Sequence, residues 1–386
     1  MSDTATSWLP WRAPHTFANG VETAFHHPLI ELRRPGAAPS RCVDPLDLLD
    51  AGDLSGAEWR PMIWARDGMA NRRPRDEVIA DNIANCEDGY YLGRLQGAFE
   101  QIYEGTGLSD MGARRWVDDV RRRQQWCAAR GAVFRLFVIP DTQSIYPDKV
   151  PGCPAPSPDR PIMRILRAAD PEVRQAIVYP YQQMCDGRAR HETCSKDDLH
   201  YTMFGAFLCY RALMDSLPGC APERLVREED LVRQEGPTIG GFGYAVGLER
   251  YHAERYMPPR APSRKLLSDP RFATGHVDVL ETDAPDLPSL VTFRTSNSSA
   301  LISTYYVRHF SRIVAVAGRH VLEDLIDSER PDVVVLEIAE RLISGSVCRP
   351  YHDPDAGPAA GPGNTFEEFT GFKLPLPRTH PQSAGV

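Results

Sequence analysis

Alternating apolar runs and amphipathic segments in the last third of the chain limit the fold more than any other feature. Three apolar runs are long enough for strands buried on both faces: SLVTFRTS (289–296), SRIVAVAG (311–318) and PDVVVLEIAE (331–340). Between them lie two segments with helical spacing, ALISTYYVRHF (300–310) and HVLEDLIDS (320–328). Short connections of this kind join parallel strands through right-handed crossovers. The sequence therefore predicts an α/β fold with three layers, in which helices cover both faces of a parallel central sheet.

The first half of the chain shows the same alternation. AVFRLFVIP (132–140) reads as a buried strand, and it follows a helical segment, residues 111–131, that stops at Gly131. TMFGAFLCYRALMDSL (202–217) reads as another helix, and EDGYYLGR (87–94) as a short strand. We therefore expect one α/β domain over residues 71–345.

The two ends of the chain differ from this middle part. Residues 1–70 are rich in Pro, Arg and Trp and have little periodicity, which predicts an irregular arm with a short helix at 44–52. Residues 346–386 are dense in Pro and Gly, and such a segment is expected to form an extended or disordered tail.

Composition and charge set limits on partners and compartment. Hydrophobic residues make up 42% of the 386 residues and charged residues 25%, as in ordinary soluble proteins. The net charge of −8 argues against a nucleic-acid partner. No run reaches the ~18 apolar residues of a membrane span, and the first residues show no secretory signal. The nine cysteines are irregularly spaced and are expected to be reduced thiols, so a cytoplasmic location is expected.

Polar stretches follow three of the predicted strands. They are IPDTQSIYP (139–147), RTSNSS (294–299) and LEIAER (336–341). Ligands of parallel sheets bind at the carboxyl ends of the strands, so we expect the site at this edge. Glu337, Glu340 and Arg341 either line that site or form a structural ion pair.

An acid and a histidine directly precede the predicted helix at 202–217. Thr202 is suited to cap this helix, which places His200 just before its N-terminus. Asp198 can curl back and accept a hydrogen bond from His200 Nδ1, leaving Nε2 free to accept a proton. This is the acid–histidine half of a nucleophilic triad, although an Asp-x-His pair also occurs by chance.

The missing nucleophile is expected at a strand end on a sharp turn into a helix. Ser296 fits, because the buried strand at 290–293 runs into a turn at 294–297 and a helix follows. The backbone N–H of Ser296 or Asn297 could then face a developing oxyanion. The alternative is that Ser296 only caps the helix.

Five motifs, taken in order, resemble one branch of the SGNH hydrolase superfamily. They are EDGYYLG (87–93), VIPDTQSIYPDKVPG (138–152), DLHYTMFGA (198–206), FRTSNS (293–298) and PDVVVLEIAERLI (331–343). In most SGNH or GDSL hydrolases the serine strand comes first and the Asp/His loop last. Here the order is circularly permuted, as in the branch of the alginate O-acetyltransferases AlgX and AlgJ, which this chain resembles over roughly residues 75–345.

The resemblance implies roles for individual residues. Asp198 and His200 match the family's Asp-x-His pair, and Ser296 matches its nucleophile. Substrate-binding or oxyanion candidates under the same resemblance are Asp141, Tyr146, Tyr201, Arg294, Thr295 and Asn297.

Several positions depart from the family pattern. Thr142 stands where a Lys is usual, Arg294 where many members have Gly, Thr295 in place of the Asp of the GDS form, and Asn297 in place of an aromatic residue. These changes fall on the walls of the expected pocket, so the identity of the polymer does not transfer.

The expected function is that of a serine-dependent O-acyltransferase, in particular an O-acetyltransferase, with a carbohydrate or other hydroxylated acceptor. The acetyl donor is a co-substrate of unknown identity, an acyl-carrying partner protein is conceivable, and no tightly bound cofactor is expected. A carbohydrate esterase with the same triad and a non-catalytic glycan-binding protein of the same fold are the alternatives. A zinc site built from Cys185, His191, Cys194 and His200 is a further alternative, although their spacing is not that of a standard zinc motif.

Overall fold

The computed structural model describes most of the domain and short pieces of both ends. The described residues are 29–33, 42–43, 58–62, 83–93, 98–150, 155–220, 222–245, 248–268, 277–318, 321–344, 366–367 and 373–375.

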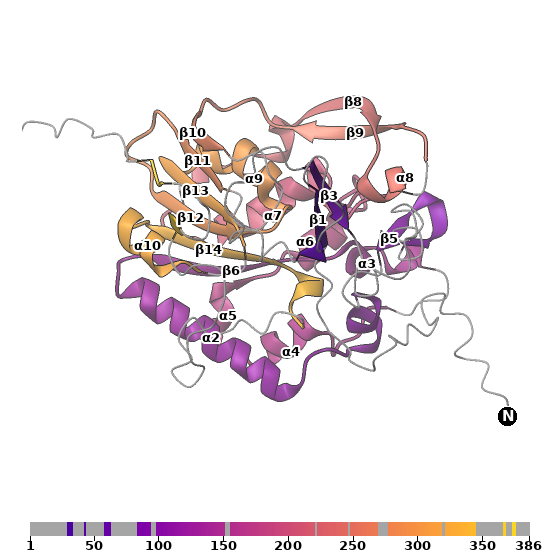
Figure 1. Cartoon of the computed structure of the whole chain (residues 1–386), viewed down its shortest axis with the longest axis horizontal. Helices are drawn as coiled ribbons and strands as arrows, with labels where there is room; N and C mark the ends of the chain where they lie inside the picture. The colour runs from indigo at the N-terminus through magenta and orange to yellow at the C-terminus, as the bar shows by residue number, and fades with distance from the viewer. Residues whose placement is uncertain are drawn as a thin grey trace, which may run out of the picture.

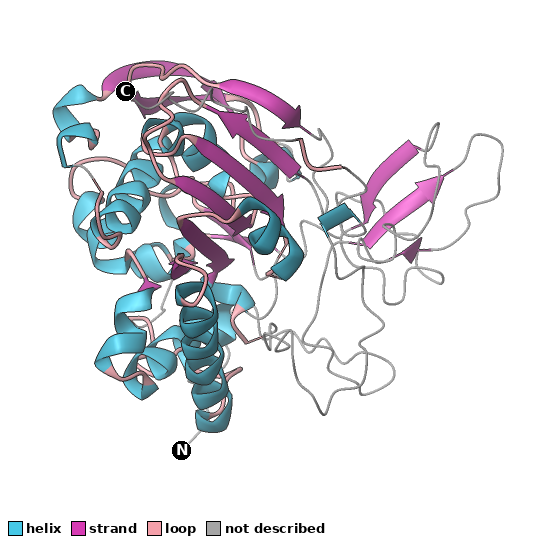
Figure 2. Ribbon diagram, turned by 90° about the vertical axis from the view of Figure 1, so that its left-hand side faces the viewer, coloured by secondary structure: helices cyan, strands magenta, loops and turns pink. Residues whose placement is uncertain are grey.

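A seven-stranded sheet with the order β10-β11-β13-β12-β14-β6-β7 forms the centre of the domain (Figures 1 and 2). From β13 to β7 all neighbouring strands are parallel, while β11 and β10 run antiparallel at one edge. The predicted α/β fold with a mainly parallel central sheet is therefore confirmed. The strands are β6 (Val133–Ile139), β7 (Ile177–Val178), β10 (Arg264–Ser268), β11 (Val277–Glu281), β12 (Ser289–Arg294), β13 (Arg312–Ala317) and β14 (Val333–Ala339).

Each face of the sheet has its own hydrophobic core, because side chains alternate between the two faces of a strand. In β14, Val333 and Val335 face the core that includes α7 (Met203–Asp215) and α9 (Ser298–Thr304). Val334 and Leu336 face the other core, beneath four further helices. These are α2 (Asp110–Ala128), α4 (Pro161–Ala168), α5 (Pro171–Ala176) and α10 (Glu323–Glu329). The domain thus has the predicted three layers.

Short elements connect these layers. They are β4 (Ile83–Asn85), η1 (Glu87–Gly89), β5 (Tyr91–Gly93), η3 (Glu100–Glu104), α3 (Thr142–Ile145), η4 (Pro147–Lys149), α6 (Tyr181–Gly187), η5 (Pro222–Arg224), η6 (Glu228–Asp230), η7 (Tyr306–Arg308) and η8 (Glu340–Leu342). Among the described residues, no helix combines the length and the apolar character needed to cross a membrane.

An antiparallel hairpin, β8 (Val232–Thr238) and β9 (Tyr251–Met257), follows α7 in the chain. Its connection contains α8 (Gly241–Ala245) and the GGFG segment, residues 240–243. The hairpin lies along the top of the molecule in Figure 1, outside the central sheet.

Only parts of the two predicted end segments lie within the described residues. Where the sequence indicated an irregular arm, three strands, β1 (Leu29–Arg33), β2 (Cys42–Val43) and β3 (Glu58–Met62), form a small antiparallel sheet. The helix expected at 44–52 lies outside the described residues. In the tail, Phe366 is buried in the α2-side core and the Pro375 carbonyl accepts a hydrogen bond from Arg312, so these two points of the tail pack on the domain. The division at residues 70 and 345 stays a prediction.

Candidate active site

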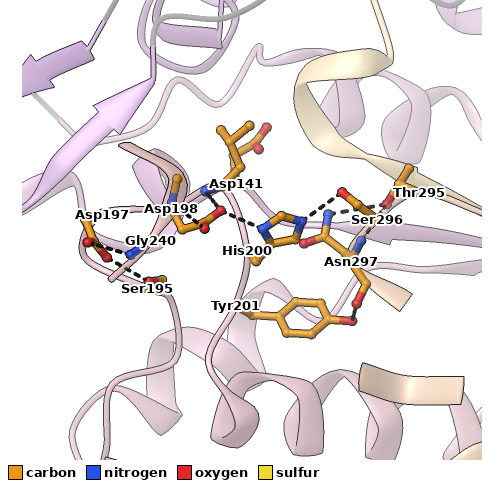
Figure 3. A network of polar contacts seen from close by, with 12 residues as sticks. Asp141, Ser195, Asp197, Asp198, His200, Tyr201, Gly240, Thr295, Ser296 and Asn297 are labelled. Atoms are coloured by element: carbon orange, nitrogen blue, oxygen red, sulfur yellow. Dashed lines mark hydrogen bonds and ion pairs between the residues drawn. The ribbon is translucent and has the colours of Figure 1, made fainter. Parts of the chain in front are cut away.

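The structure brings together three side chains from loops almost a hundred positions apart (Figure 3). His200 Nε2 lies 2.8 Å from Ser296 Oγ, and His200 Nδ1 lies 2.5 Å from Asp198 Oδ1. The His200 ring stands between the other two side chains in Figure 3. Ser296 is exposed and the other two are partly exposed, so a substrate can reach the hydroxyl.

The strand-to-helix turn after β12 explains the exposure of Ser296. β12 ends at Arg294, and α9 begins at Ser298 with Asn297 as its N-cap residue. Ser296 therefore does not take the capping position that was its alternative reading, and its hydroxyl contacts His200 instead.

Local hydrogen bonds fix the loop that carries His200. Thr202 caps α7 by accepting a bond from the N–H of Gly205 at 3.1 Å, as predicted. An isolated antiparallel bridge joins Cys194 to Tyr201, and the Ser195 N–H donates to the His200 carbonyl at 3.0 Å. His200 thus sits on a closed loop directly before the helix.

Hydrogen bonds keep Asp198 ionised, and the ionised carboxylate orients the His200 ring. Besides His200 Nδ1, its carboxylate accepts the N–H of Leu199 at 2.6 Å and that of Gly241 at 2.9 Å. Burial acts to raise the pKa of Asp198, but the His200 contact and these two N–H groups outweigh it, so the pKa is lowered. An ionised Asp198 requires a proton on Nδ1, which leaves Nε2 as the acceptor facing Ser296.

The GGFG segment of the hairpin also contacts Asp197, the residue directly before Asp198, and so supports the loop that carries the acid. The neighbouring Asp197, 1% exposed, accepts the N–H of Gly240 at 2.8 Å and the hydroxyl of Tyr251 at 2.8 Å. A Cβ at Gly240 would lie 2.3 Å from the Asp197 carbonyl oxygen, so the close approach requires glycine. The sequence analysis missed this contact, although a segment of four residues with three glycines is a signal of close backbone approach.

Three of the other predicted residues contact the serine turn. The hydroxyl of Tyr201 donates to the Asn297 carbonyl at 2.5 Å, and burial raises the pKa of Tyr201 so that it stays a donor. The backbone N–H of Asn297 and its Nδ2 both lie near Thr295 Oγ1, at 3.4 and 3.3 Å. Tyr201, Thr295 and Asn297 therefore shape the backbone around Ser296.

The remaining three candidates are buried. Arg294 donates to the Thr295 carbonyl and to Ser299 Oγ, both at 3.3 Å, and also pairs with Asp278 of β11 at 3.2 Å. Tyr146 is buried and its Oη accepts the N–H of Thr193 at 2.9 Å, which braces the start of the histidine loop. Asp141 forms a buried ion pair with Arg341. Roles of these three in binding substrate stay predictions.

The sequence left open whether Glu340 and Arg341 line the site or form a structural ion pair. In the structure their contacts are structural. Glu340 is 2% exposed and accepts bonds from Arg160 Nε at 3.1 Å, Tyr179 Oη at 2.9 Å and Ser144 Oγ at 2.7 Å. These bonds join the loops after β6 and β14 at the carboxyl edge of the sheet.

Glu337, the third residue left open, contacts the serine turn directly. It is fully buried near the end of β14 and accepts the N–H of Thr295 at 3.0 Å, as well as the hydroxyls of Thr295 and Ser298. Burial raises the pKa of Glu337 to about 7, although the bonds from Thr295, the charge of Arg294 and the Ser298 N–H act to lower it.

The four residues considered for zinc have other contacts. The His191 ring packs on Tyr256 with centroids 3.9 Å apart, and His200 is engaged by Asp198 and Ser296. Cys194 is buried, and burial raises its thiol pKa to about 12. Within the part of the chain that the structure describes, no group of three or more His, Cys, Asp or Glu side chains is arranged to hold a metal ion.

Comparison with known proteins gives matches among solved structures. No family model and no curated protein matches the chain. Bacillus cereus PatB1 with a sulfonyl adduct is similar with a TM-score of 0.51 at 12% identity, covering 68% of this chain and 98% of PatB1. The O-acetyltransferase domain of Pseudomonas putida AlgJ gives 0.45 at 16% identity, covering 71% and 96%. Pseudomonas aeruginosa AlgX gives 0.40 at 16% identity, covering 69% and 67%.

At these identities the likeness is one of fold. The chain shares the fold of PatB1. AlgJ and AlgX, which give their names to the branch that the motifs resemble, are among the similar structures.

Proposed function

We propose that this protein is a serine-dependent O-acyltransferase that works through an acyl-Ser296 intermediate. The observation that carries the proposal is the 2.8 Å contact between His200 Nε2 and Ser296 Oγ, with the other ring nitrogen held by the Asp198 carboxylate. A base in contact with an exposed hydroxyl, itself oriented by an acid, is the arrangement that activates serine for attack on an ester.

The first half of the reaction acylates Ser296. His200 Nε2 takes the proton of Ser296 Oγ while Oγ bonds to the carbonyl carbon of the donor ester, whose carbonyl oxygen gains the negative charge. The backbone N–H groups of Ser296 and Asn297 are the proposed oxyanion donors. The Asn297 N–H lies 3.4 Å from Thr295 Oγ1, and such a long hydrogen bond can be replaced by one to the oxyanion. The bond to the donor's leaving oxygen then breaks, and that oxygen receives the proton from His200.

The second half transfers the acyl group. A hydroxyl of the acceptor gives its proton to His200 Nε2 and attacks the acyl-serine, and Ser296 Oγ leaves with the proton from His200. An acetyl group and a carbohydrate acceptor are proposed from the motif resemblance, with the acetyl donor as co-substrate and no tightly bound cofactor. Water as acceptor would make the same site an esterase.

The first experiment compares three proteins with p-nitrophenyl acetate and with phenylmethanesulfonyl fluoride, which transfers a sulfonyl group to an activated serine. Wild type should hydrolyse the ester and gain one sulfonyl group by intact mass, whereas Ser296→Ala should lose up to about 10⁶-fold in turnover and gain none. Ser303→Ala, which removes an exposed hydroxyl from α9, the helix that follows Ser296, is the matched control. Hydrolysis at the wild-type rate by Ser296→Ala would refute the proposal.

A second experiment separates transferase from esterase. With p-nitrophenyl acetate as donor, adding an oligosaccharide should speed release of p-nitrophenol and yield an acetylated sugar detectable by mass spectrometry. Acetate as the sole product at every sugar concentration would assign the protein as an esterase instead.

A further inference from the structure

The turn that carries Ser296 is anchored at two points by one buried side chain. Glu337 lies on β14, the strand next to β12, and receives hydrogen bonds from Thr295, one residue before Ser296, and from Ser298, two residues after it. Thr295 donates both its N–H and its hydroxyl to this carboxylate, which therefore fixes the backbone and the side chain of Thr295 together.

We propose that Glu337 is a positioning residue for the reaction, which sets the direction of Ser296 Oγ by holding the turn through Thr295 and Ser298. The proposal rests on the acyl-serine function proposed above. Glu337 does not touch the reacting atoms, and it acts only through these two neighbours.

The contacts of Glu337 match its ionised form. A carboxylate only accepts hydrogen bonds, and Glu337 accepts the bonds from Thr295 and Ser298. A protonated carboxyl must donate through one oxygen, so one of its hydroxyl partners has to turn its hydrogen away and accept instead. Gain of a proton therefore rearranges the bonding on one side of the turn.

Charged and titratable groups from several neighbouring elements act on Glu337. Arg294 of β12 is the cation that favours its ionised form, and Arg294 also pairs with Asp278 of β11. Three buried groups also lie near Glu337: Tyr201 of the histidine loop, Tyr306 of η7 and Cys209 of α7. Burial is the main cause that raises the pKa of each of them, and the charge of Glu337 raises it further. Burial outweighs the bonds from Thr295, the charge of Arg294 and the Ser298 N–H, and it raises the pKa of Glu337 to about 7.

A relay extends from Glu337 to the proposed oxyanion donor. Because the Thr295 hydroxyl gives its proton to Glu337, its oxygen is left to accept the N–H and Nδ2 of Asn297. The orientation of the Asn297 backbone, and with it one N–H beside the reaction centre, thus depends on Glu337 through Thr295.

The test uses Glu337→Gln, which keeps the size of the side chain but never carries the charge. We expect kcat for p-nitrophenyl acetate to fall about 10- to 100-fold with little change in KM, since small displacements of a reacting atom cost rate rather than affinity. The rate constant for sulfonylation of Ser296 by phenylmethanesulfonyl fluoride should fall in parallel.

The pH profile separates positioning from mere structural support. In wild type, protonation of Glu337 should lower kcat by the same 10- to 100-fold, in addition to the loss that follows from protonation of the base His200, so part of the acid limb of log kcat against pH should have a slope above one. In Glu337→Gln the first loss is absent, so the slope should not exceed about one. Glu281→Gln, which removes a buried carboxylate that pairs with Arg312 on a distant part of the sheet, should keep the slope of the wild type.

Two outcomes overturn the inference in different ways. If wild-type labelling and hydrolysis do not require Ser296, the proposed function and this inference both fail. If they do require Ser296 but Glu337→Gln keeps the wild-type rate and slope, only the positioning role fails. Should Glu337→Gln not fold, Thr295→Val takes its place, because loss of the relaying hydroxyl should lower kcat as well, and Thr295→Ser should restore it.

Discussion

Replacing Glu337 with Gln should make the stability of the protein less dependent on pH. Burial raises the pKa of Glu337 from 4.5 to about 7, and the side chain is fully buried. The folded protein therefore holds this proton more tightly than the unfolded chain, so the stabilising effect is complete below about pH 4.5 and is lost as the pH rises through about 7. At about 1.4 kcal/mol per pKa unit, the loss amounts to roughly 3 kcal/mol of unfolding free energy. Gln has no proton to release and should show no such loss.

The assay is urea unfolding of wild type and Glu337→Gln at several values between about pH 5 and about pH 8. Subtracting the two unfolding free energies at each pH cancels all other titrating groups. The difference should move in favour of the Gln variant by roughly 2 to 3 kcal/mol over this range, since part of the change lies below about pH 5. Ser303→Ala, which removes no ionisable group, should give a flat difference. A difference for Glu337→Gln that is also flat, or that moves in favour of wild type as the pH rises, would refute the reasoning.

Three further substitutions test the contacts around the site. Asp198→Asn should lower turnover of p-nitrophenyl acetate by about 10⁴-fold, as the equivalent change does in serine proteases, because the Nδ1 proton loses its carboxylate acceptor; a loss below about tenfold would contradict this. Tyr201→Phe leaves the buried Asn297 carbonyl without its donor and should cost about 1–3 kcal/mol in urea unfolding, and an unchanged midpoint would argue against the bond. Gly240→Ala should lower kcat more than Gly236→Ala, since a Cβ at Gly240 clashes with Asp197 and one at Gly236 meets nothing within 4 Å; equal effects of the two would count against the hairpin's supporting role.

The central strands were predictable because each is buried on both faces. β12, β13 and β14 lie within the apolar runs that the sequence shows, and the burial of β14 is complete along its length. β6 likewise lies within the apolar run at 132–140, whereas β7 and the β8–β9 hairpin lack this signal. β7 has two residues, and the exposed or half-exposed side chains of the β8–β9 hairpin give no apolar run to recognise.

The acid, base and nucleophile could be anticipated, because two of them lie together in Asp-x-His and the third lies at a strand end. Their supporting residues could not. Gly240 reaches Asp197 across 43 positions and Glu337 reaches Thr295 across 42, and no local pattern encodes such contacts. The GGFG segment and the glutamate in an otherwise apolar strand were visible as exceptions in the sequence pattern. The pattern does not show which residues they contact.

The permuted order of the motifs is compatible with one site because the sheet, not the chain, decides which loops are neighbours. β12, β14 and β6 are adjacent and parallel, so their carboxyl ends lie at one edge although β6 precedes β12 by about 150 positions. The contacts at that edge follow the same adjacency: Thr295 after β12 bonds to Glu337 of β14, and Arg341 after β14 pairs with Asp141 after β6. A residue on the middle strand is therefore the one that can hold the loops on both sides. On this geometry, a buried acid near the end of β14 is where a substitution should disturb Ser296 without touching it.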